Sequence, residues 1–273
     1  MKIALYNRDR NDGVEALKAL LREKGATLVC YGEDFTSWED LPGDTELFLP
    51  LGGDGTFLQA LTFVRDRGIP VAGINFGHLG FLTTARADED GWVDALLSGR
   101  YSVEERSLIR VTCAELPASL YPFALNEVSL QRRDAAMLQV RVRIDGRELP
   151  TYWADGLVIS TPTGSTAYNL SVGGPVVMPS SEVMVIAPIA PHNLNVRPLV
   201  IPMDASVELT FRSREKGAVL TLDNRSCEIP SGTVVSLARG HHGLRYVTLS
   251  DDNFIHALQT KLFWGEDRRN ANR

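Results

Sequence analysis

Hydrophobic and polar positions in the first hundred residues alternate between two patterns. Short apolar runs bounded by turn residues predict strands, whereas apolar side chains about three to four positions apart predict amphipathic helices. The expected strands lie at residues 2–6, 26–31, 46–51 and 70–75, and the expected helices at 14–24 and 56–67. Gly25 and Gly68 are expected to end the two helices. This order predicts an α/β domain, Rossmann-like with a mostly parallel sheet, over residues 1–100.

The pattern changes near residue 101 to many short runs of β type. They lie at 107–115, 123–132, 137–144, 156–162, 183–189, 206–212, 218–223, 233–238 and 245–250. Turn signals such as Asp145-Gly146 and Asp223-Asn224 separate them. The spacing predicts a β-rich, sandwich-like domain over residues 101–252. Residues 253–273, a helical pattern with a polar tail, are expected to return to the first domain.

Composition narrows the class of protein. The chain has 273 residues, 44% of them hydrophobic, and a formal net charge of −6, which disfavours nucleic acid or an anionic membrane as partner. No apolar run of about 18 residues predicts a membrane span. Cys30, Cys113 and Cys227 lie far apart without a CxxC pair, as expected for free thiols in a reducing cytoplasm. The five histidines lack metal-ligand spacing, and we expect no dedicated metal cluster.

The stretch PLGGDGTFL, residues 50–58, joins an expected strand to an expected helix through a glycine-rich turn. Such a turn can cradle a phosphate, because glycines let the backbone approach a ligand and the helix N-terminus attracts anions. The stretch is neither a Walker A loop nor GxGxxG, since it lacks the lysine of the first and the spacing of the second. The alternative is a tight turn in which Asp54 caps the following helix.

Residues 154–175 contain an unusual density of small hydroxyl side chains. Thr161, Thr163, Ser165 and Thr166 surround Gly164, and further polar residues follow. Clustered hydroxyls and backbone N–H groups suit a polar ligand, with the Tyr168 ring available for stacking. The alternative is a long edge loop with internal Ser/Thr turns.

Two shorter stretches complete the candidates. Asn126 and Glu127 interrupt a β-type run, and strand alternation would turn one of them inward, where a ligand hydroxyl could pair with it. Alternatively, Glu127 faces solvent. In residues 73–82, glycines again allow a close ligand approach, and Phe76 and Phe81 could be pocket walls or core residues.

Five blocks, in this order, resemble the ATP-NAD kinase family. They are LGGDGTFL, GINFGHLGFL, LNEVSL, DGLVISTPTGSTAYNLSVGGP and NVRPLVI. The resemblance runs from the first strand to about Ser250. It implies an α/β N-terminal domain, a β-rich C-terminal domain, and a homodimer or homotetramer. It also implies phosphorylation of NAD at the adenosine ribose 2′-hydroxyl by ATP with a divalent ion (Mg²⁺), giving NADP and ADP.

Site roles follow from the resemblance position by position. Asp54 matches the proton acceptor, Asn126 and Glu127 match the pair that holds adenosine and its ribose, and Asp155 matches the aspartate of the DG block. Other expected binding positions are Gly55, Phe81, Thr163, Thr166, Ala167, Tyr168, Asn169, Leu170 and Ser171. The chain departs from the family pattern at Trp153, where many relatives have a basic residue, and at Asn224 and Arg225.

Two other functions remain open from the sequence. A kinase of a lipid or sugar phosphate could carry a similar glycine loop, although the hydroxyl-rich stretch and the Asn-Glu pair suit a polar nucleotide better. A non-catalytic NAD sensor would bind the dinucleotide without chemistry, but it would not need a carboxylate inside the phosphate loop.

Overall fold

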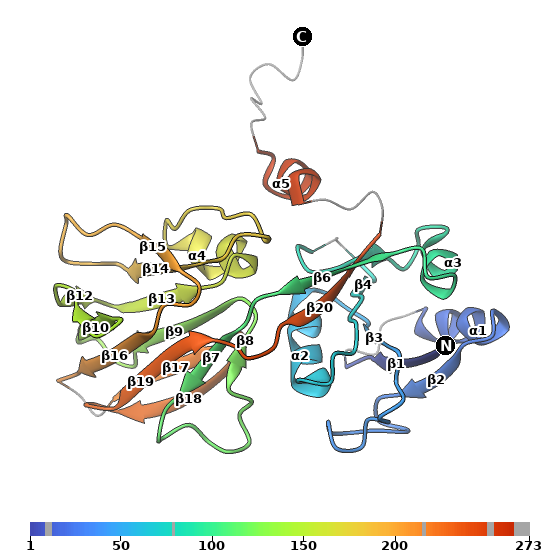
Figure 1. The fold of residues 1–273 in the computed structure, drawn as a ribbon, viewed down its shortest axis with the longest axis horizontal. Helices are drawn as coiled ribbons and strands as arrows, with labels where there is room; N and C mark the ends of the chain where they lie inside the picture. Colours follow the sequence, from blue (N-terminus) through green and yellow to red (C-terminus); the bar gives the residue numbers. More distant parts are fainter. Residues whose placement is uncertain (9–12, 78–79, 215–216, 250–253, 265–273) are drawn as a thin grey trace, which may run out of the picture. The chain divides into compact units, whose positions relative to one another are not determined.

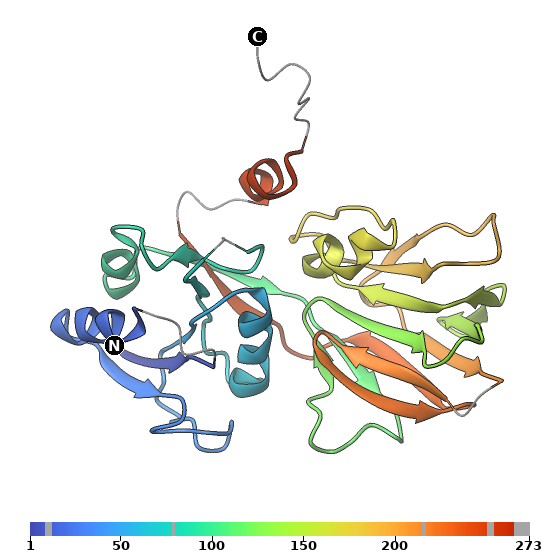
Figure 2. The same ribbon diagram turned by 180° about the vertical axis from the view of Figure 1, so that it is seen from behind.

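The computed structural model describes residues 1–8, 13–77, 80–214, 217–249 and 254–264. The chain forms two compact units, shown as ribbons in Figures 1 and 2. The first comprises residues 1–105 and 244–273, and the second is the continuous segment 106–243. The second unit is therefore inserted into the chain of the first.

The first unit contains a parallel sheet in the order β2-β1-β3, as the apolar runs predicted. Its strands are β1 (Lys2–Tyr6), β2 (Thr27–Cys30) and β3 (Leu47–Pro50). Helix α1 (Val14–Glu23) buries Val14, Leu17 and Leu21 against the sheet. Gly25, with φ +87°, follows its end, a conformation that suits glycine.

Two predictions for the first unit need correction. Helix α2 (Asp54–Val64) begins within the glycine loop and ends before Gly68. The expected strand at 70–75 is confirmed in part: β4 (Ile74–Asn75) pairs with β5 (Ala85–Arg86), and Val71 forms single parallel bridges with Phe48 and Tyr246, but the strand is not continuous. At Gly73, a Cβ would lie 2.8 Å from the Phe57 ring and 3.0 Å from a backbone carbonyl, so only glycine fits at this position.

Segments distant in sequence complete the first unit. Strand β6 (Ser102–Arg106) pairs with β20 (Leu244–Thr248). Helix α5 (Phe254–Leu262) confirms the helical pattern near the end of the chain. The short α3 (Trp92–Leu97) was not predicted, because six residues show too little periodicity. The polar tail at 265–273 and His78 lie outside the described residues.

The second unit consists of two antiparallel sheets, confirming the sandwich-like expectation (Figure 1). One sheet contains β7 (Ile109–Thr112), β8 (Phe123–Ala124), β10 (Leu138–Ile144), β11 (Arg147–Glu148), β12 (Tyr152–Ala154), β16 (Val207–Arg212) and β19 (Val234–Arg239). The other contains β9 (Glu127–Arg132), β13 (Gly156–Ser160), β14 (Val183–Ile189), β15 (Leu199–Pro202), β17 (Gly217–Leu222) and β18 (Arg225–Pro230). Their facing side chains, such as Val140, Leu209 and Leu157, form one apolar core.

Strand β13 is buried along its whole length. Leu157 and Ile159 belong to the core between the sheets. The segment after the strand, with a 3₁₀ turn (Thr163–Thr166) and α4 (Tyr168–Ser171), also packs against β13. A strand that is covered on both faces has a continuous apolar run instead of alternating apolar and polar residues, and the GLVIS sequence of β13 is such a run.

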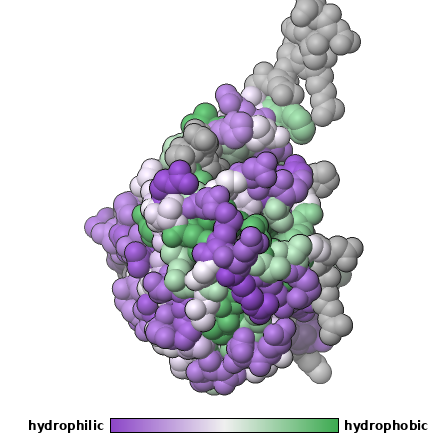
Figure 3. Space-filling model, turned by 90° about the vertical axis from the view of Figure 1, so that its right-hand side faces the viewer, coloured by the Kyte–Doolittle hydropathy of each residue, from purple (hydrophilic) through white to green (hydrophobic). Residues whose placement is uncertain are grey.

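Hydrophilic side chains dominate the face on the side of α1 and α3, with smaller apolar areas between them (Figure 3). Leu20 and Trp38 are among the partly exposed large apolar residues of the first unit. None of the helices in the described residues is long and apolar enough to cross a membrane.

An aromatic cluster in the first unit gives a test of core stability. Phe48 is fully buried, with ring centroids 5.8 Å from Phe63 and 6.2 Å from Phe35. Phe48→Ala should therefore lower the free energy of unfolding by about 3–5 kcal/mol, measured by urea denaturation. The matched control Phe263→Ala, at a side chain that is 52% exposed, should cost less than about 1 kcal/mol. Equal losses for the two variants would contradict the assignment of Phe48 to the core.

Candidate functional site

Asp54 is the first residue of α2, and its carboxylate binds a distant loop. Its Oδ2 accepts the N–H of Phe81 at 2.9 Å, and its Oδ1 accepts the N–H of Leu82 at 3.0 Å. The residue before it, Gly53, is the N-cap, and no side chain caps the helix. The capping alternative for Asp54 is therefore wrong. The two N–H donors orient the carboxylate and leave each oxygen with capacity for a further hydrogen bond.

Glycines around Asp54 serve two different purposes. A Cβ at Gly80 would lie 1.9 Å from the Asp54 Oδ1, so only glycine lets this loop reach the carboxylate. Gly52 has φ +156°, which side-chain-bearing residues rarely adopt. Gly53 and Gly55 are exposed and have open space where a Cβ would lie. A ligand can therefore approach the backbone on both sides of Asp54.

Lys261 of α5 contacts the loop that contains Gly80 and Phe81, and the sequence did not indicate this contact. Its ammonium group donates to the carbonyl oxygen of Gly80 and lies 5.0 Å from the centre of the Phe81 ring. The Phe81 side chain is half-buried, whereas Phe76 packs against the core. A helical pattern gives no sign that one of its lysines approaches a loop 181 positions earlier.

Asn126 and Glu127 form the centre of a second cluster, in the second unit. Their exposed fractions are 7% and 9%, so the alternative that Glu127 faces solvent is wrong. The Asn126 Oδ1 and the Glu127 Oε2 are buried and have no hydrogen-bond partner. Buried polar atoms are nearly always paired, and two orphaned oxygens on consecutive residues indicate a polar ligand that forms hydrogen bonds with them.

Burial raises the pKa of Glu127 from 4.5 to about 8, and the charge of Asp223 adds to this shift. A hydrogen bond from the backbone N–H of Tyr168 works in the opposite direction. The Glu127 carboxyl group is therefore largely protonated at neutral pH. Asp223 stands out in the sequence only as part of a turn signal, which does not predict that it lies beside Glu127.

The hydroxyl-rich stretch is held mainly by its own side chains. The Thr161 hydroxyl donates to the Leu125 carbonyl at 2.5 Å, and the Thr161 N–H donates to the Asn126 carbonyl at 2.9 Å. The Ser165 hydroxyl donates to the Val177 carbonyl at 3.1 Å. These contacts support internal turns at these positions and fix the stretch beside Asn126.

The other expected binding residues of this stretch differ in exposure. Thr163 and Asn169 are buried, and the Asn169 Nδ2 closes the loop by donating to the Ser165 and Pro175 carbonyls. Thr166, Ala167, Tyr168 and Leu170 are half-buried, and Ser171 is exposed. The Asn169 Oδ1 is a third buried acceptor without a partner.

Asp155 forms an ion pair that the sequence did not indicate. Its Oδ1 lies 2.8 Å from the Arg132 Nε, and its backbone carbonyl accepts the Arg132 N–H. Nearby in sequence, the Trp153 side chain is 40% exposed. The carboxylate is thus paired but remains partly accessible.

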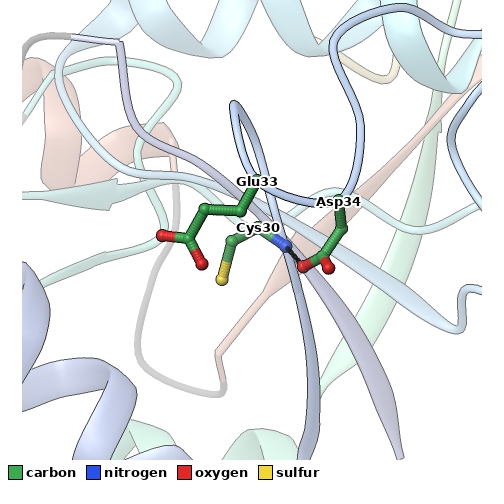
Figure 4. Close-up of side chains that lie close together, drawn as sticks. All are labelled: Cys30, Glu33 and Asp34. Carbon is green, nitrogen blue, oxygen red and sulfur yellow. Dashed lines mark hydrogen bonds between the residues drawn. The ribbon is translucent and has the colours of Figure 1, made fainter.

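A cavity of about 520 Å³ lies at the carboxyl ends of β1 and β2 and includes Cys30, Glu33 and Lys18 in its wall. Cys30, Glu33 and Asp34 have ligand atoms within 4.8 Å of one another (Figure 4). The Glu33 carboxylate pairs with the Lys18 ammonium at 3.1 Å, and the Asp34 carboxylate accepts the Cys30 N–H at 2.6 Å. Both carboxylates are therefore already engaged, and this cluster carries no metal assignment.

Two family models match the chain. The ATP-NAD kinase N-terminal domain matches residues 39–101, and the ATP-NAD kinase C-terminal domain matches residues 125–249. The NAD kinase of Flavobacterium psychrophilum is 38% identical over 94% of this chain and 88% of its own. The NAD kinase of Porphyromonas gingivalis is 41% identical over 97% of this chain and 98% of its own.

Solved structures share the fold. An NAD kinase from Archaeoglobus fulgidus in complex with ATP has a TM-score of 0.75 and 27% identity, covering 92% of this chain and 94% of its own. A yeast NADH kinase complexed with NADH has a TM-score of 0.86 at 23% identity, covering 98% of this chain and 89% of its own. The latter likeness concerns the fold alone.

The raised pKa of Glu127 predicts a pH-dependent stability. Between its ordinary pKa of 4.5 and about 8, the unfolded chain releases this proton while the folded chain keeps it. The stability of the wild type relative to Glu127→Gln should therefore be highest below about pH 4.5, fall as the pH rises, and level off above about 8. Urea unfolding across this range measures the difference. Glu115→Gln, at an exposed site, is the matched control and should follow the wild-type profile. A difference between Glu127→Gln and the wild type that does not change with pH would contradict the shift.

Proposed function

The chain belongs to the ATP-NAD kinase family, and we propose that it transfers the γ-phosphoryl group of ATP to the 2′-hydroxyl of the adenosine ribose of NAD, giving NADP and ADP. The observation that carries the phosphoryl-transfer step is the Asp54 carboxylate. It is held by the Phe81 and Leu82 N–H groups and flanked by glycines with open space beside them.

Asp54 acts as the general base. A secondary hydroxyl is a poor nucleophile at neutral pH, and a carboxylate within hydrogen-bond reach orients it and takes its proton. The 2′-oxygen forms a bond to the γ-phosphorus, and the bond from that phosphorus to the β,γ-bridging oxygen breaks, so ADP leaves. The remaining contribution of the protein is positioning and charge neutralisation, as in other phosphoryl transfers.

Asn126 and Glu127 bind the adenosine part of NAD. Ribose hydroxyls both donate and accept hydrogen bonds, and the adenine amino group donates, so these groups can pair with the unpartnered Asn126 Oδ1 and with the Glu127 Oε2 in either protonation state. The remaining contacts are assigned to Gly55 and Phe81 beside Asp54, and to Asp155, Thr163, Thr166, Ala167, Tyr168, Asn169, Leu170 and Ser171.

The divalent ion is proposed to arrive as MgATP. In the part of the chain that the structure describes, the one group of three or more candidate ligands is Cys30, Glu33 and Asp34. A thiol is a poor ligand for Mg²⁺, which prefers oxygen. When bound, the ion would supply charge neutralisation on the polyphosphate.

We infer a homodimer or homotetramer from the family, and a cytoplasmic location, which the three free cysteines support. A lipid or sugar phosphate kinase is a weaker candidate, because the orphaned acceptors lie in a polar, hydroxyl-rich surrounding. A sensor is weaker because Asp54 is oriented by two N–H donors inside the glycine loop.

Replacing the base tests the mechanism. Asp54→Asn should slow NADP formation by about two to four orders of magnitude. Because the asparagine amide can accept only one of the two N–H groups of Phe81 and Leu82, calorimetry of NAD binding measures any separate effect of a displaced loop. Asp66→Asn, at an exposed site in the same unit, is the matched control and should keep wild-type turnover. Near wild-type turnover of Asp54→Asn would remove Asp54 from the base role.

The reaction itself separates the three candidate functions. Incubation of the protein with NAD, ATP and Mg²⁺ should form NADP, and removing the ion with a chelator should stop the reaction. Binding of NAD without any NADP would identify a sensor. Phosphorylation of a lipid or sugar phosphate in preference to NAD would identify another kinase.

A further inference from the structure

Residues 121–127 contain a break between β8 and β9 that lies outside the regular strand ladder. Buried N–H groups still need acceptors there. The Asp223 carboxylate supplies them: it accepts the N–H of Leu125 at 3.0 Å, of Asn126 at 2.7 Å and of Glu127 at 3.3 Å. One side chain thus holds three consecutive residues, including both that carry the orphaned acceptors.

Arg225 binds two backbone carbonyl groups of the same segment. Its Nη1 donates to the Tyr121 carbonyl at 2.7 Å, and its Nη2 donates to the Phe123 carbonyl at 2.6 Å. The Nη2 also lies 3.3 Å from the Asp223 Oδ2. A planar guanidinium can serve these three acceptors at once, whereas a lysine ammonium is a single point charge.

The pair formed by Asp223 and Arg225 is shielded from water. The Asp223 side chain is fully buried and that of Arg225 is 12% exposed. Burial raises the pKa of Asp223, and the charge of Arg225 opposes this shift. The two-residue turn between Leu222 and Arg225 places the pair at the start of β9, because Leu222 pairs with Val128 in the sheet.

We propose that Arg225 is a positioning residue for the adenosine subsite, because it holds the Tyr121 and Phe123 carbonyls and Asp223 so that Asn126 and Glu127 present their acceptors at fixed points. The identity of the ligand rests on the function proposed above. Arg225 touches no reacting atom. Its effect passes through the backbone to the two side chains, and a site misplaced by a small distance loses affinity for its ligand.

Kinetics of Arg225 variants test this role. Arg225→Lys keeps the positive charge but loses the planar set of guanidinium N–H donors. This variant should raise the KM for NAD by about tenfold, while the KM for ATP stays within about twofold. Arg225→Gln, which lacks the charge as well, should raise the KM for NAD further. Arg133→Lys is the matched control: Arg133 is an exposed arginine of the same unit, paired with Glu228 at 2.7 Å, and this variant should leave both constants unchanged.

A double-mutant cycle separates positioning from general stability. If Arg225 acts through Asn126 and Glu127, Arg225→Lys should raise the KM for NAD by a smaller factor when Asn126→Ala is present than in the wild-type background, because only the route through Glu127 remains. Independent effects of the two substitutions would overturn the proposal. So would parallel losses for NAD and ATP, or failure of both Arg225 variants to fold, because either would make Arg225 a residue of the fold as a whole.

Hydrogen exchange tests the backbone link without reference to activity. Arg225→Lys should speed exchange of the amides of residues 125–127 by about tenfold or more, measured by mass spectrometry, while residues 156–160 stay protected. Unchanged exchange at residues 125–127 would overturn the proposal. A wild-type protein that makes no NADP would refute the proposed function, and the exchange result would still decide whether Arg225 holds this segment.

Discussion

The candidate sites depend on one constraint: backbone N–H groups that leave a strand ladder inside the protein must still find acceptors. Aspartate carboxylates meet this need at both candidate sites. Asp54 takes the N–H groups of Phe81 and Leu82, and Asp223 takes those of residues 125–127. In both places the chain becomes irregular without leaving buried donors unpaired, and irregular backbone is what a binding site needs.

The two carboxylates nevertheless have different surroundings. Asp54 lies between exposed glycines and is partly accessible, so it keeps capacity for a ligand proton. Asp223 is completely buried and faces Arg225, so its carboxylate oxygens bind groups of the protein and are not accessible to a ligand. Both residues are aspartates, so the residue type does not distinguish them. A carboxylate with accessible lone pairs can take part in catalysis, whereas one whose lone pairs are all engaged can only stabilise the fold.

The sequence predicted what is local in the structure. The apolar runs gave β1, β2 and β3, the spacing of Val14, Leu17 and Leu21 gave α1, and Asp145-Gly146 gave a two-residue hairpin. The five family blocks pointed to Asp54 and to the Asn126-Glu127 pair. The sequence did not reveal why residue 73 is a glycine, because the close approach of Phe57 and the backbone near Leu82 arises only in the folded chain.

The supporting partners were missed for a similar reason. Arg225 contacts carbonyls 102 and 104 positions earlier, and Lys261 contacts a loop 181 positions earlier. A motif records which residues lie together in the chain, whereas these contacts depend on the sheet register and the chain path. In the sequence, Arg225 is distinguished only by its departure from the family pattern, and the carbonyl groups that it contacts are not adjacent to it in the chain.

The insertion of the second unit has a consequence for biosynthesis. Val71 exchanges backbone hydrogen bonds with Arg245 and Val247, and the Thr84 hydroxyl donates to the Val247 carbonyl. The ribosome therefore releases the whole 106–243 segment before the first unit can acquire its last strand. The first unit begins to emerge before the second unit and is completed after it, so the loop that holds Asp54 is assembled on a scaffold that is completed only after the second unit has been synthesised.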